Sequence, residues 1–231
     1  MSAGKSACST SEPAGVSTIV DFAGERLGYR DAVVLDDVRL SIAAGERIAL
    51  VGESGAGKTT LLRAILERCA ARAAYIPQDL GLVQALTVFH SVYMGRLHTR
   101  HTLRNLLLPA KPEVAAIGAV LDRLRMADKL FSPVGALSGG QQQRTAFGRA
   151  LYHPGDVLLG DEPVSAVDEH QAREILGTAA AAKATLVVAM HDRALALETA
   201  DRVVGLRDGR IALDAPTAGM TPGDLDALYR S

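Results

Sequence analysis

The sequence has little of what usually marks a nucleic-acid-binding or membrane-spanning protein. It contains no tryptophan, and aromatic residues make up 4% of its 231 residues, which argues against single-stranded nucleic acid bound by stacking on aromatic rings. Its formal net charge is −1, so it lacks the basic excess of a nucleic-acid binder. No apolar run approaches the roughly 20 residues that a helix needs to cross a bilayer. We therefore expect no nucleic acid among its partners and no membrane-spanning helix.

Cysteine is also scarce. The two cysteines, Cys8 and Cys69, form neither a disulfide framework nor a metal-binding pattern, which fits a reducing cytosol. Residues 1–16 are rich in Ser, Ala and Gly and lack the apolar stretch of a secretory signal. We expect a disordered leader over residues 1–16 and one large domain over residues 17–231.

A glycine-rich loop lies between an apolar run and a helix-like run. The loop consists of Gly52, Glu53, Ser54, Gly55, Ala56, Gly57, Lys58, Thr59 and Thr60. This layout is typical of a P-loop, in which backbone N–H groups surround phosphate oxygens at the start of a helix. Lys58 can then reach the outer phosphates, and the Thr59 hydroxyl can bind a magnesium ion. A chance match is the alternative, but the flanking elements disfavour it, so the loop predicts nucleotide binding.

A second candidate phosphate cradle follows Leu137. It consists of Ser138, Gly139, Gly140 and Gln141 at the start of a helical run, where a hydroxyl and free backbone N–H groups can bind an anion. The alternative is an ordinary capped turn. The full pattern is rare by chance, which favours the phosphate-binding interpretation.

An acidic pair, Asp161 and Glu162, follows the apolar run Val157–Leu159. An acid at the C-terminal end of a parallel strand beside a P-loop can hold magnesium through water. The next acid can accept a proton from an attacking water molecule. A pair of acids on a wet surface is a common alternative, and the two phosphate cradles favour the catalytic interpretation.

Together these motifs resemble the ATP-binding cassette family, the ATPase subunits of ABC transporters. The resemblance covers the chain from about Val16 onward and includes Gln-Gln-Gln-Arg ending at Arg144. It implies an α/β fold with a P-loop NTPase core, a helical subdomain inserted at about residues 79–136, and the ligands ATP and Mg²⁺. It also implies a head-to-tail dimer, in which the signature at Ser138 binds the γ-phosphate held by the partner's P-loop; a homodimer is the simplest assembly. Asp161 would be the Walker B aspartate and Glu162 the catalytic base.

Four further positions match the family by order and spacing. Gln78 matches the Q-loop glutamine, which touches magnesium and the water molecule. His191 matches the switch histidine at the γ-phosphate, although a lone histidine is more often structural. Asp168 ends the D-loop motif Ser165–Asp168, which communicates across the dimer. Tyr29 stands where the family stacks an aromatic ring on adenine, although a loop tyrosine more often only packs.

Hydrophobic periodicity gives the outline of the fold. Alternation predicts strands at 17–22 and 38–42, and buried runs predict strands at 47–51, 74–78, 156–161 and 184–190. Helical patterns follow the P-loop to about Ala70, continue after Thr87, and start again at Pro112. Asp208 and Gly209 predict a hairpin between 202–206 and 210–213. Because residues 61–77 leave room for only one helix and one strand, we expect a reduced antiparallel β subdomain.

Two stretches resemble phosphonate importer ATPases in particular: residues 81–97 and the ending at 225–230. This resemblance implies an importer ATPase for phosphonate or a related oxyanion, such as phosphite or phosphate. Such a subunit binds a membrane permease at the cytoplasmic face of the inner membrane and acts indirectly with a periplasmic solute-binding protein. The alternative is an accessory or scaffold ATPase of a carbon–phosphorus bond-cleaving system, without transport. DNA-repair and translation ATPases of the superfamily are disfavoured, because the chain has neither a long coiled coil nor two cassettes.

Overall fold

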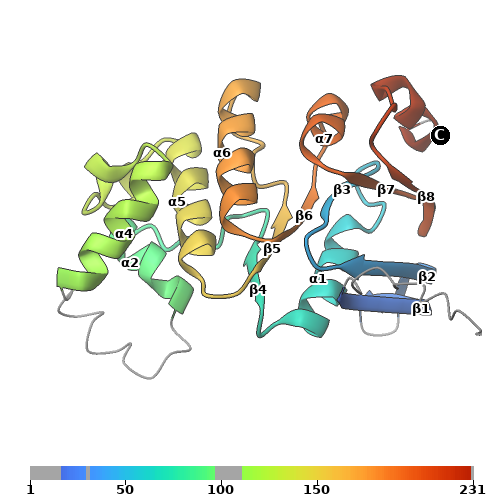
Figure 1. The fold of residues 1–231 in the computed structure, drawn as a ribbon, viewed down its shortest axis with the longest axis horizontal. Helices are drawn as coiled ribbons and strands as arrows, with labels where there is room; N and C mark the ends of the chain where they lie inside the picture. Colours follow the sequence, from blue (N-terminus) through green and yellow to red (C-terminus); the bar gives the residue numbers. More distant parts are fainter. Residues whose placement is uncertain (1–16, 30–31, 97–110, 230–231) are drawn as a thin grey trace, which may run out of the picture.

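The structure, a computed structural model, describes residues 17–29, 32–96 and 111–229. The expected leader at 1–16 lies outside the described residues, and so does part of the stretch 81–97. Figure 1 shows a central sheet with helices on both faces, a group of helices at one end and a two-stranded sheet near the other. Among the described residues, no helix combines the length and the apolar character needed to cross a membrane.

The central sheet has six strands in the order β4-β5-β6-β3-β7-β8. Their bounds are β3 Arg47–Val51, β4 Ala73–Ile76, β5 Val157–Asp161, β6 Thr185–Ala189, β7 Arg202–Arg207 and β8 Arg210–Pro216. The pairings from β4 to β7 are parallel, and β8 runs antiparallel to β7. All residues of β5 and β6 are buried, as expected for parallel strands covered on both faces. The predicted buried strands and the late hairpin are confirmed.

The sheet separates two hydrophobic cores. On one face, α1 (Lys58–Cys69) packs with β1 (Thr18–Tyr29) and β2 (Ala32–Ala43). On the other face lie α5 (Gly139–Tyr152), α6 (Glu169–Ala182), α7 (Arg193–Thr199) and the final 3-10 helix η4 (Pro222–Tyr229). β3 contributes Ile48 and Leu50 to the first core and Ala49 and Val51 to the second, because side chains alternate along a strand.

The antiparallel subdomain is small, as expected. β1 and β2 form a two-stranded sheet, and β4 is the one strand between α1 and Gln78. β1 extends well beyond the predicted strand at 17–22, and β2 extends well beyond the predicted strand at 38–42. The added length carries register shifts and a left-handed Gly24, and many of its side chains are exposed, so alternation did not reveal it.

The described helices between residues 79 and 136 gather at one end of the molecule (Figure 1). They are α2 (Val88–Tyr93), α4 (Lys111–Arg123) and the 3-10 turns η1 (Met94–Arg96), η2 (Ala127–Lys129) and η3 (Val134–Ala136). Thr87 caps α2 as expected, since its side chain accepts a hydrogen bond from the His90 N–H group. α4 begins at Lys111, one residue before the predicted Pro112, and buries Ile117 and Leu121. The subdomain boundaries at about 79 and 136 stay a prediction.

Candidate functional site

The glycine-rich loop leads from β3 into α1, as predicted. Gly52 has a φ of 145°, and a Cβ atom there would collide with the Leu206 carbonyl oxygen of β7. Gly57, at the N-cap of α1, has a φ of 103° and gives no side-chain cap to the helix. The first N–H groups of α1 therefore have no side-chain cap and are available to an anion.

Lys58 is buried at the start of α1. Its ammonium group donates hydrogen bonds to the carbonyl oxygens of Gly52 (2.9 Å) and Glu53 (3.0 Å). Burial lowers the pKa of Lys58, while the nearby carboxylates of Glu162 and Asp161 favour its charged form. The lysine is thus anchored to the loop beside which a phosphate would bind.

Thr59 and Asp161 supply a pair of oxygen donors. The Thr59 hydroxyl donates a hydrogen bond of 2.7 Å to Asp161, whose buried side chain ends β5. Hydroxyl and carboxylate oxygens are ligands that Mg²⁺ prefers, and Mg²⁺ is often held by one or two protein oxygens together with phosphates. No group of three or more His, Cys, Asp or Glu residues suits a metal within the described ranges. These two oxygens therefore fit a magnesium ion bound jointly with a nucleotide.

The three residues predicted to act in catalysis meet at one point. Gln78 Nε2 donates to Glu162 Oε2 at 3.4 Å, and His191 Nε2 lies 2.5 Å from Glu162 Oε1. They come from the carboxyl ends of β4, β5 and β6, which are neighbours in the sheet. Glu162 has a φ of 52° and donates its N–H to the Ala189 carbonyl oxygen. Because a non-glycine residue with positive φ is strained, the fold must hold this carboxylate in place.

Tyr29 lies at the rim of the same site. Its hydroxyl accepts hydrogen bonds from Thr60 (3.3 Å) and Arg63 (3.4 Å), and the Arg63 guanidinium lies 5.5 Å from the ring centroid. The tyrosine is 42% exposed, which leaves ring surface open for stacking. A pocket of about 420 Å³ is lined by Tyr29, Ser54, Gly55, Gly57, Lys58, Thr59, Thr60, Gln78 and Glu162, together with Val34 and Arg63.

The second predicted cradle is not in this pocket. Ser138 accepts a hydrogen bond from the Gln141 N–H, and Gln141 Oε1 accepts one from the Ser138 N–H at 3.0 Å, so the two residues form a capping box on α5. A Cβ atom on Gly140 would lie 2.9 Å from Val167, and one on Gly139 would lie 3.5 Å from Ala166. The signature therefore packs beside the D-loop motif.

Asp168, at the end of that motif, caps α6 by accepting a hydrogen bond from the Gln171 N–H at 2.9 Å. The predicted site residues thus fall into two groups. The first group surrounds the P-loop pocket, and two of its members, Glu53 and Ala56, line a second pocket beside the P-loop. The second group lies at the N-termini of α5 and α6. The roles assigned to individual residues of both groups stay predictions.

The sequence motifs did not identify two residues that lie at the site, Arg63 and Tyr229. Arg63 sits beside Tyr29, and the hydroxyl of Tyr229 accepts a hydrogen bond from the Gly52 N–H at 3.1 Å. Arg63 lies in the helix after the P-loop, so its spacing could have suggested a place near the pocket. Tyr229 is 177 residues from Gly52, and no local pattern joins the two.

Fold and site together define a P-loop nucleotide-binding protein of the α/β class, with an acidic residue held beside the P-loop pocket. The model of the ABC transporter family matches residues 35–165. The chain therefore belongs to the ABC transporter family, as the sequence motifs predicted.

Curated relatives narrow the comparison. The chain is 37% identical over 257 residues to the phosphonates import ATP-binding protein PhnC of Anaeromyxobacter dehalogenans, covering 99% of this chain and 51% of that protein. The chain thus spans about half the length of that relative. It is 38% identical to the protein of the same name from Pseudomonas putida, covering 89% of this chain and 88% of the relative.

Solved structures confirm the fold. A bacterial Atm1-family ABC exporter with ATP bound superposes with a TM-score of 0.72 at 24% identity, covering 91% of this chain and 42% of that one. The ADP conformation of MJ1267, an ATP-binding cassette of an ABC transporter, gives a TM-score of 0.69 at 20% identity, covering 88% of this chain and 91% of that one. At these identities the similarity concerns the fold alone.

Proposed function

We propose that this chain hydrolyses ATP as the nucleotide-binding subunit of an importer for phosphonate or a related phosphorus oxyanion. The observation that carries the proposal is the meeting of Glu162 with Gln78 and His191 beside the P-loop pocket. The importer part rests on the curated relatives, whose names describe phosphonate import ATP-binding proteins. These names favour import over the accessory role in carbon–phosphorus bond cleavage.

The chain's own residues supply most of what hydrolysis needs. Lys58 and the N–H groups at the start of α1 hold the phosphates, and Thr59, Asp161 and Gln78 would hold Mg²⁺. The bound metal ion neutralises charge on the phosphate oxygens. A water oxygen attacks the γ-phosphorus, the bond to the ADP oxygen breaks, and the water proton passes to Glu162. Gln78 and His191 fix the Glu162 carboxylate and contact the reacting groups.

A second copy of the chain would complete the site. Ser138, Gly139 and Gly140 lie at the start of α5, outside the pocket of their own P-loop. A head-to-tail homodimer would place each signature on the ATP bound to the other copy. Closing that dimer is the step that we expect to drive transport.

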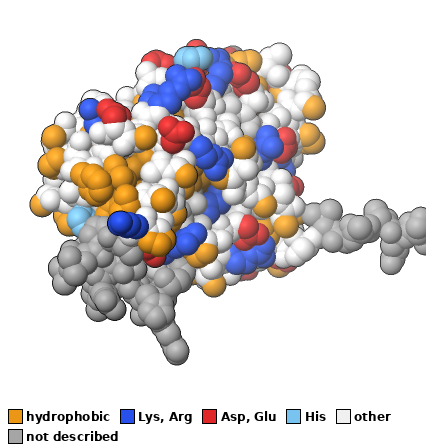
Figure 2. Space-filling model, turned by 60° about the vertical axis from the view of Figure 1, so that its left-hand side comes forward, with side chains coloured by type: hydrophobic (Ala, Val, Ile, Leu, Met, Phe, Trp, Pro, Cys, Tyr) orange, Lys and Arg blue, Asp and Glu red, His pale blue; other side chains and the backbone are white. Residues whose placement is uncertain are grey.

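The helical end is the surface that we assign to the permease. Figure 2 shows hydrophobic side chains gathered on this side of the molecule. Phe131 is 61% exposed and Val83 is 49% exposed, and both lie within the predicted subdomain that begins just after Gln78. An exposed apolar surface of this kind is typical of a protein–protein contact. The chain would then act at the cytoplasmic face of the inner membrane through the permease, and indirectly with a periplasmic solute-binding protein.

A single substitution tests the hydrolytic role. Glu162→Gln keeps the shape and removes the base, so we expect ATP binding to persist while turnover falls by about 100-fold or more. ATP should then hold the variant as a stable dimer in size-exclusion chromatography. Glu67→Gln, on the exposed face of α1, is the matched control and should keep normal turnover. Near-normal hydrolysis by Glu162→Gln would refute the assignment of the base.

The solute requires a test in the cell. Deleting the gene should abolish growth on phosphonate as the sole phosphorus source, and wild-type protein should restore it while Glu162→Gln should not. Parallel cultures on phosphite and on phosphate show which oxyanion is carried. Co-purification with soluble carbon–phosphorus enzymes, and with no permease, would contradict the transport role.

A further inference from the structure

The first peptide group of the P-loop depends on the C-terminal segment. The ladder between β3 and β7 ends at the pair Val51 and Gly205, so the Gly52 N–H lies beyond it. Tyr229, in η4, provides the acceptor for this N–H group through its hydroxyl, at 3.1 Å. A backbone N–H group without a partner in a partly buried place is costly, so this contact stabilises the loop.

The peptide group on the other side of Gly52 contacts the P-loop lysine, Lys58. Its carbonyl oxygen accepts a hydrogen bond from Lys58 Nζ at 2.9 Å. The two peptide groups that flank Gly52 are thus held by Tyr229 and by Lys58. Glycine rotates freely between such groups, so its conformation has to be fixed by contacts with other side chains.

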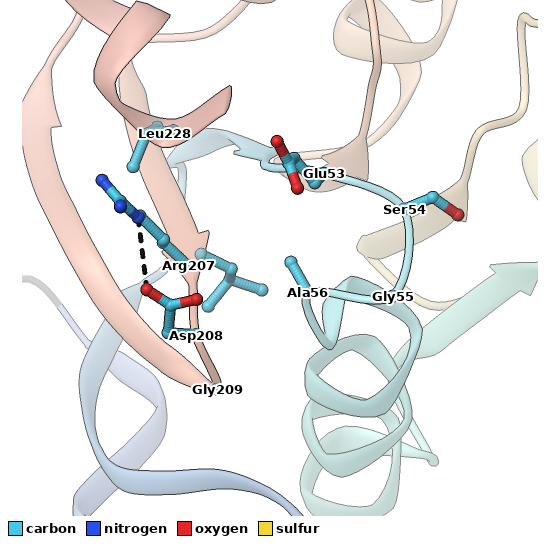
Figure 3. A pocket seen from close by; sticks show the side chains of 9 residues that line it. Glu53, Ser54, Gly55, Ala56, Arg207, Asp208, Gly209 and Leu228 are labelled. Carbon is cyan, nitrogen blue, oxygen red and sulfur yellow. Dashed lines mark ion pairs between the residues drawn. The ribbon is translucent and has the colours of Figure 1, made fainter. Parts of the chain in front are cut away.

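The segment that carries Tyr229 is itself firmly packed. Leu225 and Leu228 are buried in the core, and a Cβ atom on Gly205 would collide with Leu228. Arg207 donates a hydrogen bond of 2.8 Å to the Ala227 carbonyl oxygen. Figure 3 shows Leu228 and the P-loop residues Glu53 and Ala56 around one pocket of about 570 Å³. The C-terminal segment therefore forms a wall on the flank of the P-loop.

Arg193 contacts the ring of Tyr229. Its guanidinium lies 5.2 Å from the centroid of the Tyr229 ring and forms an ion pair with Asp226 of the same segment. A cation held over an aromatic ring attracts it, and an ion pair on the same segment restricts it further. Arg193 is the first residue of α7, and His191 precedes it by two residues.

We propose that Tyr229 is a positioning residue that fixes the Gly52 peptide of the P-loop and so sets the affinity for ATP. This inference deepens the proposed ATPase function and rests on it. Tyr229 contacts the loop and is not among the residues that line the pocket around Lys58 and Thr59, and Arg193, paired with Asp226, holds its ring in place.

The principal test is Tyr229→Phe, which removes only the hydroxyl group. We expect the KM for ATP and the Kd of a fluorescent ATP analogue to rise by about 2- to 10-fold, as for the loss of one hydrogen bond. The kcat should stay within about twofold, because Glu162, Gln78 and His191 are unchanged. Tyr152→Phe, which removes a hydroxyl in α5, is the matched control and should leave KM unchanged. Unaltered KM and Kd in Tyr229→Phe would overturn the proposal.

A second variant tests the role of Arg193. Arg193→Met should also raise the KM for ATP. The double variant Arg193→Met/Tyr229→Phe should raise KM by less than the product of the two single increases, because Arg193 acts by placing the Tyr229 hydroxyl. Fully multiplicative effects would overturn the part assigned to Arg193.

One measurement is independent of ATP turnover. The backbone amide resonance of Gly52 should move in Tyr229→Phe and stay in place in Tyr152→Phe. If the wild-type protein hydrolyses no ATP but the Gly52 resonance moves in Tyr229→Phe, the proposed function is refuted and the contact between Tyr229 and Gly52 is supported. If the wild-type protein hydrolyses ATP but the Gly52 resonance does not move in Tyr229→Phe, only the inference about Tyr229 is refuted.

Discussion

Arg149 offers a test of how the fold holds the catalytic glutamine. It lies in α5 and is partly buried, and its guanidinium donates to the carbonyl oxygens of Leu80 (2.6 Å) and Gly81 (2.7 Å). Both acceptor residues have positive φ, 62° and 54°, and they follow Gln78 closely in the chain. Burial lowers the pKa of Arg149, and Asp79 favours its charged form. The arginine thus holds a turn in which Leu80 has a strained backbone conformation.

The size of the effect follows from these contacts. Hydrogen bonds from a charged group contribute about 1.5–3 kcal/mol each, so two give about 3–6 kcal/mol. Arg149→Met keeps much of the volume and no longer has to bury a charge, which offsets part of that loss. We expect a net loss of about 2–3 kcal/mol in the free energy of unfolding, or a fall of about 1 M in the urea midpoint at a typical slope.

Turnover should respond as well. Once the turn relaxes, Gln78 no longer faces Glu162, and misplacement of a positioned group by about 1 Å can cost about 100-fold in rate. We expect kcat to fall at least about 10-fold, while the Kd for ATP changes little because the P-loop is untouched. Urea unfolding and steady-state ATPase assays measure the two effects.

The matched control is Arg123→Met. Arg123 is exposed at the end of α4 and makes one long hydrogen bond, 3.4 Å, to the Thr178 carbonyl oxygen. Its replacement should change stability by less than about 0.5 kcal/mol. An Arg149→Met variant that unfolds at the wild-type urea concentration would refute the argument that this side chain holds the turn.

Two more predictions concern the P-loop and a buried lysine. Gly52→Ala should weaken binding of a fluorescent ATP analogue by at least about 10-fold, because its Cβ would meet the Leu206 carbonyl; Gly45→Ala, with φ 92° and open space, should cost stability and leave binding intact. Burial lowers the pKa of Lys183 from 10.5 to about 8. Since the unfolded chain binds more protons between these values, wild-type stability should rise from about pH 8 to 10.5 relative to Lys183→Met. Urea unfolding at each pH measures this difference, and parallel profiles would contradict it.

The parts of the fold that local pattern predicts are those whose signal lies within a few neighbouring residues. Val157–Leu159 is a buried apolar run, and the structure has a fully buried strand there. The shortage of residues between Thr60 and Gln78 correctly predicted a small antiparallel subdomain. Gln78, Glu162 and His191 follow three separate strands, and the structure brings their side chains together, while the roles that the family resemblance implied stay predictions.

Contacts between distant segments could not be predicted in this way. Tyr229 reaches Gly52 across 177 residues, and Arg149 reaches Leu80 across 69. Each depends on how whole elements pack, which a short pattern does not record. The lengths of β1 and β2 were underestimated for a related reason: their added residues are mostly exposed or half-buried, with Leu35 the buried exception, and follow no regular alternation.

The row of strands beneath the site also bears on how the protein folds. Gln78, Glu162, His191 and Gly52 follow β4, β5, β6 and β3, which lie side by side in that order about 4.8 Å apart. The sheet thus sets the spacing between groups that are separated by more than 100 residues of chain. A fragment that lacks any one of β4, β5, β6 and β3 lacks part of the site. ATP should therefore bind only a chain in which these four strands are paired, and its binding energy adds to the stability of the folded domain.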